Sequence, residues 1–255
     1  MKRRAIIFMA WGETFVREVE NCIGRSNWGA DFDVILLTDE ATSIGKMQEK
    51  LTRVVRCDFR MSGYLRKTEM MRYVPDGYDS FLFLDSDTVV VEDISLGFEM
   101  AERFQIAMSP APHYSLESFW GFDRIMRAEG VRCAGHMQYN TGVIFFQKCP
   151  AVAAVFARWE ELAVKHGADY KIDQPFFTLA MEQLEFNPYT LSISFNYRGF
   201  GDAISGLLRI WHSHGEMPQG INTFKRSWPP RRAWPSKLVF PYDPNRPWMK
   251  WFFSA

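Results

Sequence analysis

The chain has 255 residues, of which 47% are hydrophobic and 16% aromatic, and its formal net charge at pH 7 is zero. This length predicts one large domain or one domain with an extension, and the apolar fraction is ample for a core. The balanced charge gives no reason to expect a nucleic-acid partner, and no apolar stretch reaches the roughly 18 residues of a membrane-spanning helix.

The first ten residues are basic and then apolar, as in a signal peptide. The apolar run is short, however, and Glu13 and Arg17 follow it without a segment resembling a cleavage site, so a first strand explains it better. The four cysteines are far apart and show no C-x-x-C spacing. This pattern favours reduced thiols in a cytoplasmic protein over disulfides or a zinc site.

The first third of the chain alternates short apolar runs with segments of helical spacing. Strands are expected at residues 5–10, 33–39, 52–57 and from 80, and helices at 14–23, 43–51 and 63–73. Such alternation is typical of βαβ units. It predicts an α/β fold with a mixed, mainly parallel central sheet flanked by helices.

The rhythm is less regular after residue 87. Strands are expected at 104–108, 141–147 and 207–212, and helices at 150–166 and 173–183. Residues 109–139 are rich in Pro, Gly, His and aromatics, with one helical patch at 122–129. A segment this long and irregular predicts a binding loop or lid on the acceptor side of a site.

The C-terminal segment differs in composition from the rest. Residues 222–255 hold seven basic residues, one acid and nine aromatics. We therefore expect a domain over residues 1–221 and a basic, aromatic extension over 222–255. The extension either packs across the domain or lies at an anionic membrane surface, although its prolines argue against one continuous amphipathic helix.

The most informative stretch is Phe81–Leu84, four apolar residues that predict a strand buried on both faces, followed by Asp85 and Asp87. If the extended backbone continues through Ser86, both carboxylates project to one side. Two anions held together there need a cation, and oxygen ligands suit Mn²⁺ or Mg²⁺. The position at the carboxyl end of a strand favours a ligand site over a solvated turn.

A second Asp-x-Asp occurs at residues 31–33. It precedes an apolar run instead of ending one, so a turn before a strand is the simpler interpretation.

Four short motifs occur in a recognisable order. They are Asp85-Ser86-Asp87, Tyr139-Asn140-Thr141-Gly142-Val143, Asp173-Gln174 and His212-Ser213-His214-Gly215. With these the chain resembles a GT-A glycosyltransferase over roughly residues 5–218. It is most similar to glycosyltransferase family 8, which includes glycogenin-like and bacterial lipopolysaccharide galactosyltransferases.

The resemblance implies a metal site and a donor site. Asp85 and Asp87 would bind Mn²⁺ that bridges the two phosphates of a sugar nucleotide, with His212 as the third protein ligand and Gly215 completing the His-x-x-Gly motif. By strand alternation His214 competes with His212 for this role. Ala10, Phe15, Asp39 and Ser86 would lie along the nucleotide, with Phe15 in place of a tyrosine that stacks on the base.

The resemblance also implies groups around the donor sugar. Asn140 would face the donor sugar or acceptor, Asp173 and Gln174 would lie near the donor sugar, and Lys67 or Arg66 would lie near the sugar or phosphates. From the residues alone, Lys67 could equally be a solvated charge, Asp173 a helix N-cap, Asn140 a turn residue and His212 a core histidine.

The sequence departs from the family pattern at two places. The acid expected before the base-stacking aromatic is missing, and Pro218 stands where a phosphate-binding lysine is usual. Lys225 or Arg226 would have to substitute for that lysine.

The activity implied is metal-dependent transfer of a hexose from a nucleoside-diphosphate sugar, expected to be a UDP-sugar, to a glycan, lipid-linked or small-molecule hydroxyl acceptor, with retention of anomeric configuration. One alternative is a haloacid-dehalogenase-type phosphatase with Asp85 as nucleophile, although that motif normally lies on the first strand. The other is a non-catalytic GT-A-like binding domain. The donor sugar, the linkage and the oligomeric state stay open.

Overall fold

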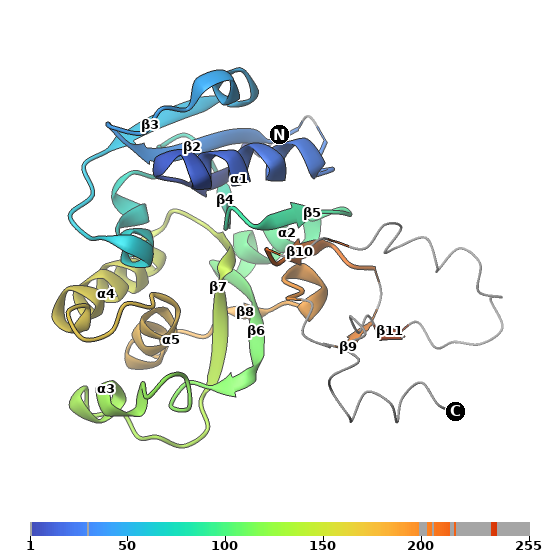
Figure 1. Cartoon of the computed structure of the whole chain (residues 1–255). Helices are drawn as coiled ribbons and strands as arrows, with labels where there is room; N and C mark the ends of the chain where they lie inside the picture. Colours follow the sequence, from blue (N-terminus) through green and yellow to red (C-terminus); the bar gives the residue numbers. More distant parts are fainter. Residues whose placement is uncertain are drawn as a thin grey trace, which may run out of the picture.

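A computed structural model of the chain describes residues 2–29, 31–198, 203–205, 207–214, 217 and 236–238 (Figure 1). Its centre is a seven-stranded sheet in the order β3-β2-β1-β4-β7-β6-β8. The bounds are β1 Arg4–Met9, β2 Asp33–Asp39, β3 Arg53–Cys57, β4 Ser80–Leu84, β6 Ile106–Ser115, β7 Met137–Phe146 and β8 Tyr189–Thr190.

The first four strands in this order run parallel, and β8 is parallel to β6. Strand β7 is antiparallel to both of its neighbours, β4 and β6. The expected mixed, mainly parallel sheet flanked by helices is therefore confirmed.

Helices cover both faces of the sheet. They are α1 Gly12–Arg25, α2 Ser95–Phe104, α3 Asp123–Ala128, α4 Pro150–His166 and α5 Gln174–Gln183, with 3₁₀ helices η1 Gly45–Lys50, η2 Gly63–Arg72 and η3 Ile193–Phe195. None of the helices in the described part of the chain is long and apolar enough to cross a membrane.

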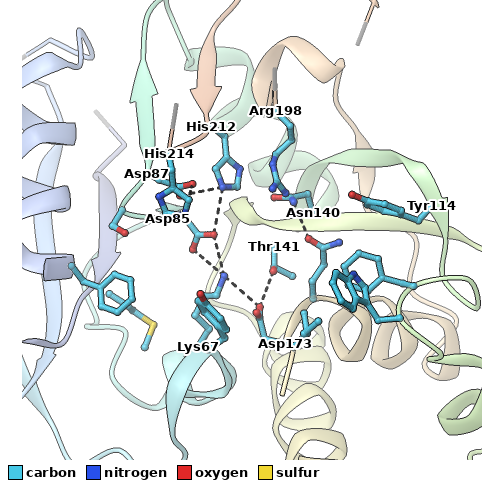
Figure 2. A pocket seen from close by; sticks show the side chains of 18 of the residues that line it. Lys67, Asp85, Asp87, Tyr114, Asn140, Thr141, Asp173, Arg198, His212 and His214 are labelled. Atoms are coloured by element: carbon cyan, nitrogen blue, oxygen red, sulfur yellow. Dashed lines mark hydrogen bonds and ion pairs between the residues drawn. The ribbon is translucent and has the colours of Figure 1, made fainter. Parts of the chain in front are cut away.

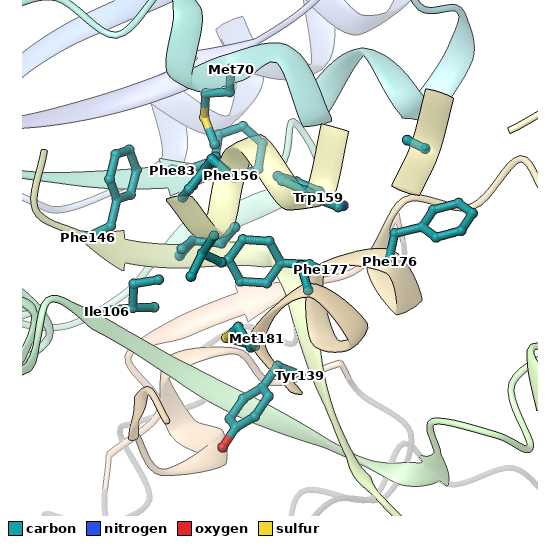
Figure 3. Close-up of a cluster of buried hydrophobic side chains, with 14 of the residues drawn as sticks. Met70, Phe83, Ile106, Tyr139, Phe146, Phe156, Trp159, Phe176, Phe177 and Met181 are labelled. Atoms are coloured by element: carbon teal, nitrogen blue, oxygen red, sulfur yellow. The ribbon is translucent and has the colours of Figure 1, made fainter. Parts of the chain in front are cut away.

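The central strands are buried on both faces because alternate side chains enter two different cores. Ile7 of β1 and Phe83 of β4 pack with residues of η2, α3, α4 and α5, including Trp159 and Phe177 (Figure 3). The neighbours of these two residues, Phe8 and Leu84, pack on the other face with residues of α1 and α2. This two-sided burial explains the apolar runs without polar alternation.

Two small sheets lie outside the central one. Strand β5 Thr88–Val90 pairs antiparallel with β10 Ile210–His212, with Thr88 opposite His212. Strands β9 Ala203–Ser205 and β11 Ser236–Leu238 also pair antiparallel. The β5–β10 pair matters most, because it brings a late part of the chain to the end of β4.

Several expected elements need correction. The strand expected at 104–108 begins at Ile106 and continues to Ser115, and the one expected at 141–147 begins at Met137, so the two pair over much of the segment expected to be irregular. Register shifts near Pro110 accommodate the prolines there. The irregular part is confined to the segment around α3. Helix α2 was not expected, and the last strand begins at Ile210 instead of residue 207.

The backbone also departs from expectation at the aspartate pair. It does not stay extended through Ser86: β4 ends at Leu84, and Ser86 and Asp87 form a turn before β5. The side-by-side placement of the two carboxylates therefore comes from this turn and not from strand alternation.

Candidate active site

The end of β4 carries a cluster of two carboxylates and one imidazole (Figure 2). His212 Nε2 lies 3.2 Å from Asp87 Oδ1 and 3.7 Å from Asp85 Oδ2. One ligand atom from each of the three residues can be chosen so that all lie within 4.8 Å of one another. The turn after β4 supplies the aspartates, and the pairing of β10 with β5 supplies the histidine.

The residues of this cluster fit a divalent cation. Carboxylate oxygens and an imidazole nitrogen form a donor set suited to Mn²⁺ or a similar ion. A Cβ added at Gly142 would lie 2.1 Å from His212 Cε1 and 2.7 Å from Asp85 Oδ2. The backbone of β7 therefore comes this close to the cluster only because residue 142 is glycine.

Electrostatics favour the anionic form of Asp87. Burial would raise the pKa of Asp87, but the hydrogen bond and charge of His212 outweigh burial and the pKa is lowered. His214 is more peripheral. Its side chain is 74% exposed, and its Nε2 lies 3.6 Å from Asp87 Oδ2, so His212 is the better placed of the two histidines.

Lys67 is a buried cation between two carboxylates, not a solvated surface charge. Its Nζ lies 2.9 Å from Asp85 Oδ1 and 3.4 Å from Asp173 Oδ2. Burial alone would lower the pKa of Lys67, but the charges of Asp173 and Asp85 outweigh it and the pKa is raised. The ammonium therefore stays protonated and supplies a fixed positive charge beside the cluster.

Asp173 stands at the N-cap position of α5, but its side chain makes no capping hydrogen bond. Its carboxylate accepts a hydrogen bond of 2.8 Å from Thr141 Oγ1 instead. Burial raises the pKa of Asp173, and Lys67 offsets part of that rise. This buried carboxylate faces the same cavity as the aspartate pair.

A chain of side-chain amides fixes the orientation of His212. The backbone N–H of Gly142 donates to Asn140 Oδ1, and Asn196 Nδ2 donates to the same oxygen, both at 2.9 Å. Asn140 Nδ2 donates to Gln174 Oε1 at 2.8 Å. A backbone N–H can only donate, so the polarity of this network is set, and Asn196 Oδ1 is left to accept from His212 Nδ1 at 2.7 Å. With Nδ1 carrying a proton, Nε2 is the atom that faces the cluster: it would offer its lone pair to a bound cation, and without a cation a proton on Nε2 is donated to Asp87.

The network includes one functional residue that the sequence motifs missed. Asn196 is buried and follows the short helix η3. It belongs to none of the four motifs, and no local pattern marks it. Only the fold reveals its contact with His212.

These groups line a cavity of about 390 Å³. Nine of the expected site residues line it: Phe15, Lys67, Asp85, Ser86, Asp87, Asn140, Asp173, Gln174 and His212. Lining residues that the sequence did not indicate include Trp11, Tyr64, Tyr114, Phe119, Trp120 and Arg198.

Three expected site residues do not line this cavity in the described structure. Ala10 is fully buried, and Asp39 accepts hydrogen bonds from Thr42 Oγ1 at 2.6 Å and Arg66 Nη1 at 2.9 Å. Arg66 is thus turned away from the carboxylates that Lys67 contacts. Gly215 lies outside the described residues, as do Pro218, Lys225 and Arg226.

The mainly parallel sheet with antiparallel β7, flanked by helices, matches the fold of the GT-A glycosyltransferases. No protein-family model matches the sequence, and no curated protein matches it significantly. Solved structures that it resembles are glycosyltransferases of this fold.

Three of these structures illustrate the likeness. The glycosyltransferase GlyE of Streptococcus pneumoniae TIGR4 is 16% identical, with a TM-score of 0.55 over 83% of this chain and 54% of that chain. Mouse xyloside xylosyltransferase 1 is 14% identical, with a TM-score of 0.54 over 85% and 100%. An active-site mutant of LgtC is 13% identical, with a TM-score of 0.58 over 87% and 94%.

The chain spans little more than half the length of the GlyE chains it resembles, 54% of one and 60% of another. At these identities the likeness shows the fold alone.

Proposed function

We propose that the protein is a metal-dependent glycosyltransferase that moves a hexose from a nucleoside-diphosphate sugar to a hydroxyl acceptor. The observation that carries this proposal is the cluster of Asp85, Asp87 and His212 at the end of β4, inside a GT-A fold. The expected cation is Mn²⁺ or Mg²⁺. The two carboxylates and His212 Nε2 would hold it, and Gly142 leaves room for the cluster.

Transfer from a sugar nucleotide breaks the bond between the anomeric carbon and a phosphate oxygen, and negative charge grows on the leaving diphosphate. A bound divalent cation supplies Lewis-acid stabilisation of that charge. Lys67 would add a fixed positive charge from the protein, because its ammonium stays protonated. Such a leaving group needs no proton, so the reaction requires no general acid.

We expect retention of anomeric configuration, as the family resemblance implies. Retention requires either a nucleophile on the far face of the sugar or attack on the same face as departure. Asp173 and Gln174 are the candidates for the face opposite the leaving group. Lys67 and Thr141 would hold the Asp173 carboxylate, and Asn140 would hold the Gln174 amide.

The remaining assignments belong to the same proposal. Phe15, whose ring lies 5.4 Å from that of Trp11, would stack on the base, expected to be uracil. Residues 1–221 would form the catalytic domain and act in the cytoplasm on a glycan, lipid-linked or small-molecule acceptor. Residues 222–255 would pack on the domain or lie at a membrane surface; they fall outside the described residues except for 236–238.

The phosphatase alternative finds less support than the transferase. Asp85 follows the fourth strand of the chain, and its carboxylate is engaged by Lys67. A non-catalytic binding domain would share the same cluster, so turnover must separate it from the transferase.

Thermal unfolding with and without Mn²⁺ and UDP tests the proposal. Joint stabilisation of wild type is expected, about 2.7 kcal/mol at a hundredfold excess over Kd, and Asp87→Ala should abolish it. Asp31→Ala is the matched control, because Asp31 belongs to the second Asp-x-Asp, in the bend before β2, and should leave the stabilisation unchanged.

A screen of sugar nucleotides for metal-dependent hydrolysis then separates an enzyme from a binding domain. Turnover of a generic phosphate ester, abolished by Asp85→Asn, would instead favour the phosphatase. No response of wild type to metal and nucleotide would contradict the proposal.

A further inference from the structure

Exposed aromatic side chains gather at the candidate active site. Among the described residues, four aromatic side chains are strongly exposed, and three of them, Tyr64, Tyr114 and Trp120, line the cavity. Trp120 is the most exposed at 77%. A large apolar surface left in water at a polar cavity indicates a ligand that covers it.

The turn that carries Trp120 is well anchored. Leu116 and Phe122 on either side are fully buried. The carbonyl of Phe119 accepts hydrogen bonds from Tyr170 Oη at 2.9 Å and from the backbone N–H of Phe122 at 3.1 Å. The exposure of the Trp120 ring is therefore set by a fixed turn.

The backbone at this turn suits glycine better than tryptophan. Trp120 has φ +52°, in the left-handed region that a bulky residue rarely occupies. Folding alone gives no reason for a tryptophan there, since the side chain buries little surface. Backbone strain of this kind concentrates at functional sites. The strained position of the Trp120 ring therefore indicates that the ring contacts a ligand.

Tyr114 completes the aromatic side of the cavity. It lies near the end of β6 and lines the cavity (Figure 2). Its ring packs edge-on against that of Phe119, with 4.9 Å between the ring centroids. Polar groups of Asn140 and Gln174 lie in the same cavity. The cavity thus offers aromatic rings and hydrogen-bonding amides together.

A pyranose ring matches this combination, because one face presents C–H groups that pack on an aromatic ring while its edge presents hydroxyls. We propose that Trp120 and Tyr114 form a platform for a pyranose of the acceptor, so that the acceptor is a saccharide. This inference rests on the proposed function and names the substrate class that the same site accepts.

The sheet order argues against the nucleobase as occupant of this platform. Trp11 and Phe15 follow β1, on one side of β4. Tyr114 lies near the end of β6 and the turn with Trp120 follows β6, which is two strands away from β4 on the other side. The two aromatic pairs therefore flank the aspartate cluster from opposite sides. The donor base has its own aromatic pair beside β1.

Binding to an array of immobilised mono- and oligosaccharides, in the presence of Mn²⁺ and UDP, tests this inference. Wild type should bind at least one saccharide. Trp120→Ala should weaken that binding tenfold or more, and Trp120→Phe should keep most of it. Phe104→Ala is the matched control, because Phe104 is an exposed aromatic that does not line the cavity, and it should behave as wild type.

Trp120→Gly separates function from folding. Its melting temperature should equal or exceed that of wild type, because glycine relieves the positive φ, yet its saccharide binding should fall as in Trp120→Ala. Equal saccharide binding by wild type and Trp120→Ala, or no saccharide bound by wild type, would overturn the inference.

The response of the same variants to Mn²⁺ and UDP distinguishes the two proposals. Unchanged nucleotide binding by Trp120→Ala is expected. Weakened UDP binding by this variant would assign the ring to the donor and overturn the inference. If wild type itself does not respond to metal and nucleotide, the proposed function has failed instead.

Discussion

Lys67 is the residue whose charge decides the electrostatics of the cavity. Its ammonium is the buried cation that contacts both Asp85 and Asp173. A buried ion pair adds little net stability relative to an apolar pair, but removing one partner leaves an uncompensated charge and typically costs about 3–5 kcal/mol. Lys67 therefore holds together a cluster of anions that would otherwise repel.

Lys67→Met should destabilise the metal-free protein by about 3–5 kcal/mol and should raise the affinity for Mn²⁺, because the two carboxylates then need another cation. Urea unfolding in EDTA and in Mn²⁺ measures both effects. Lys50→Met is the control, since the pair of Lys50 with Glu20 is solvent-exposed and should matter little. Equal unfolding midpoints in EDTA for wild type and Lys67→Met would contradict this account.

Asn196 fixes which tautomer of His212 is present, because its Oδ1 accepts from His212 Nδ1. We expect Asn196→Ala to lower Mn²⁺ affinity about 10–100-fold, because His212 loses the acceptor that holds its Nδ1 proton. Asn196→Asp keeps that acceptor and should retain most of the affinity, while its second oxygen repels Asn140 Oδ1 and lowers stability. Calorimetric titration with Mn²⁺ measures the affinities.

The tautomer itself can be observed without metal. Nitrogen NMR of the apo protein should find a proton on His212 Nδ1 in wild type, and the fraction of molecules that carry it should fall in Asn196→Ala. An unprotonated Nδ1 in wild type would refute the polarity assigned to the amide network.

At the scale of elements, β7 is the strand that shapes the site. It carries Asn140, Thr141 and Gly142 past the end of β4, where the carbonyl of Gly142 accepts from the backbone N–H of Asp85 at 2.8 Å. It also pairs with β6, from Met137 opposite Ser115 to Phe146 opposite Ile106, and Tyr114 precedes Ser115 on β6. One strand therefore connects the cluster of Asp85, Asp87 and His212 with the amide network and with the strand that carries Tyr114.

Gly142→Ala should abolish Mn²⁺ binding, because the new Cβ would fall within 2.1 Å of His212 Cε1. Gly97→Ala is a matched control: its Cβ would lie 2.4 Å from the Phe145 ring in the core, so it should cost about 1–3 kcal/mol of stability and leave Mn²⁺ affinity intact. Metal titration at a temperature where both variants are folded makes the comparison. Normal Mn²⁺ binding by Gly142→Ala would show that the cluster tolerates displacement of His212.

The strands of the central sheet show how much of the fold can be predicted from the sequence. Strands β1, β2 and β4 are buried on both faces, and their apolar runs identified them closely. Strands were expected at 104–108 and 141–147, but the extension of β6 over 109–115 and of β7 over 137–140 was missed. The prolines and polar residues there resemble a loop, and the register shifts that accommodate them depend on the partner strand. The turn at Ser86 was missed because strand alternation alone would also place both carboxylates on one side.

Across the whole molecule, the site joins parts of the chain that no local pattern connects. The order of motifs, through a family resemblance, indicated Asp85, Asp87 and His212 together, and the structure brings them within ligand distance of one another. Asn196, Tyr114 and Trp120 lie in segments without such motifs. Only tertiary packing brings Asn196 against His212 and the two aromatic residues to the cavity. Tertiary contacts decided this part of the site.

Two buried carboxylates join separate parts of this architecture, and we expect them to contribute to the acid stability of the whole molecule. Glu102 of α2 accepts hydrogen bonds from Arg4 and Ser80 on the central strands. Glu129, after α3, pairs with Lys165 and His166 of α4. Burial alone would raise the pKa of each carboxyl, but these partners outweigh burial and lower each pKa from 4.5 to about 2.

A carboxyl whose pKa is lowered on folding adds stability that is fully present above its unfolded pKa and is lost as pH falls towards the folded value. Each carboxylate should thus contribute on the order of 2–3 kcal/mol at pH 7, lost between about pH 4.5 and pH 2. Urea unfolding across this range should give a shallower pH dependence for Glu102→Gln and for Glu129→Gln than for wild type.

The effects of the two substitutions should add in the double variant, because the two carboxylates share no partner. Glu161→Gln, in an exposed pair with Arg158, should follow the wild-type curve. If Glu102→Gln and Glu129→Gln also follow the wild-type curve, other carboxylates must govern acid unfolding. The contacts of α2 and of α3 with the rest of the fold would then depend on packing alone.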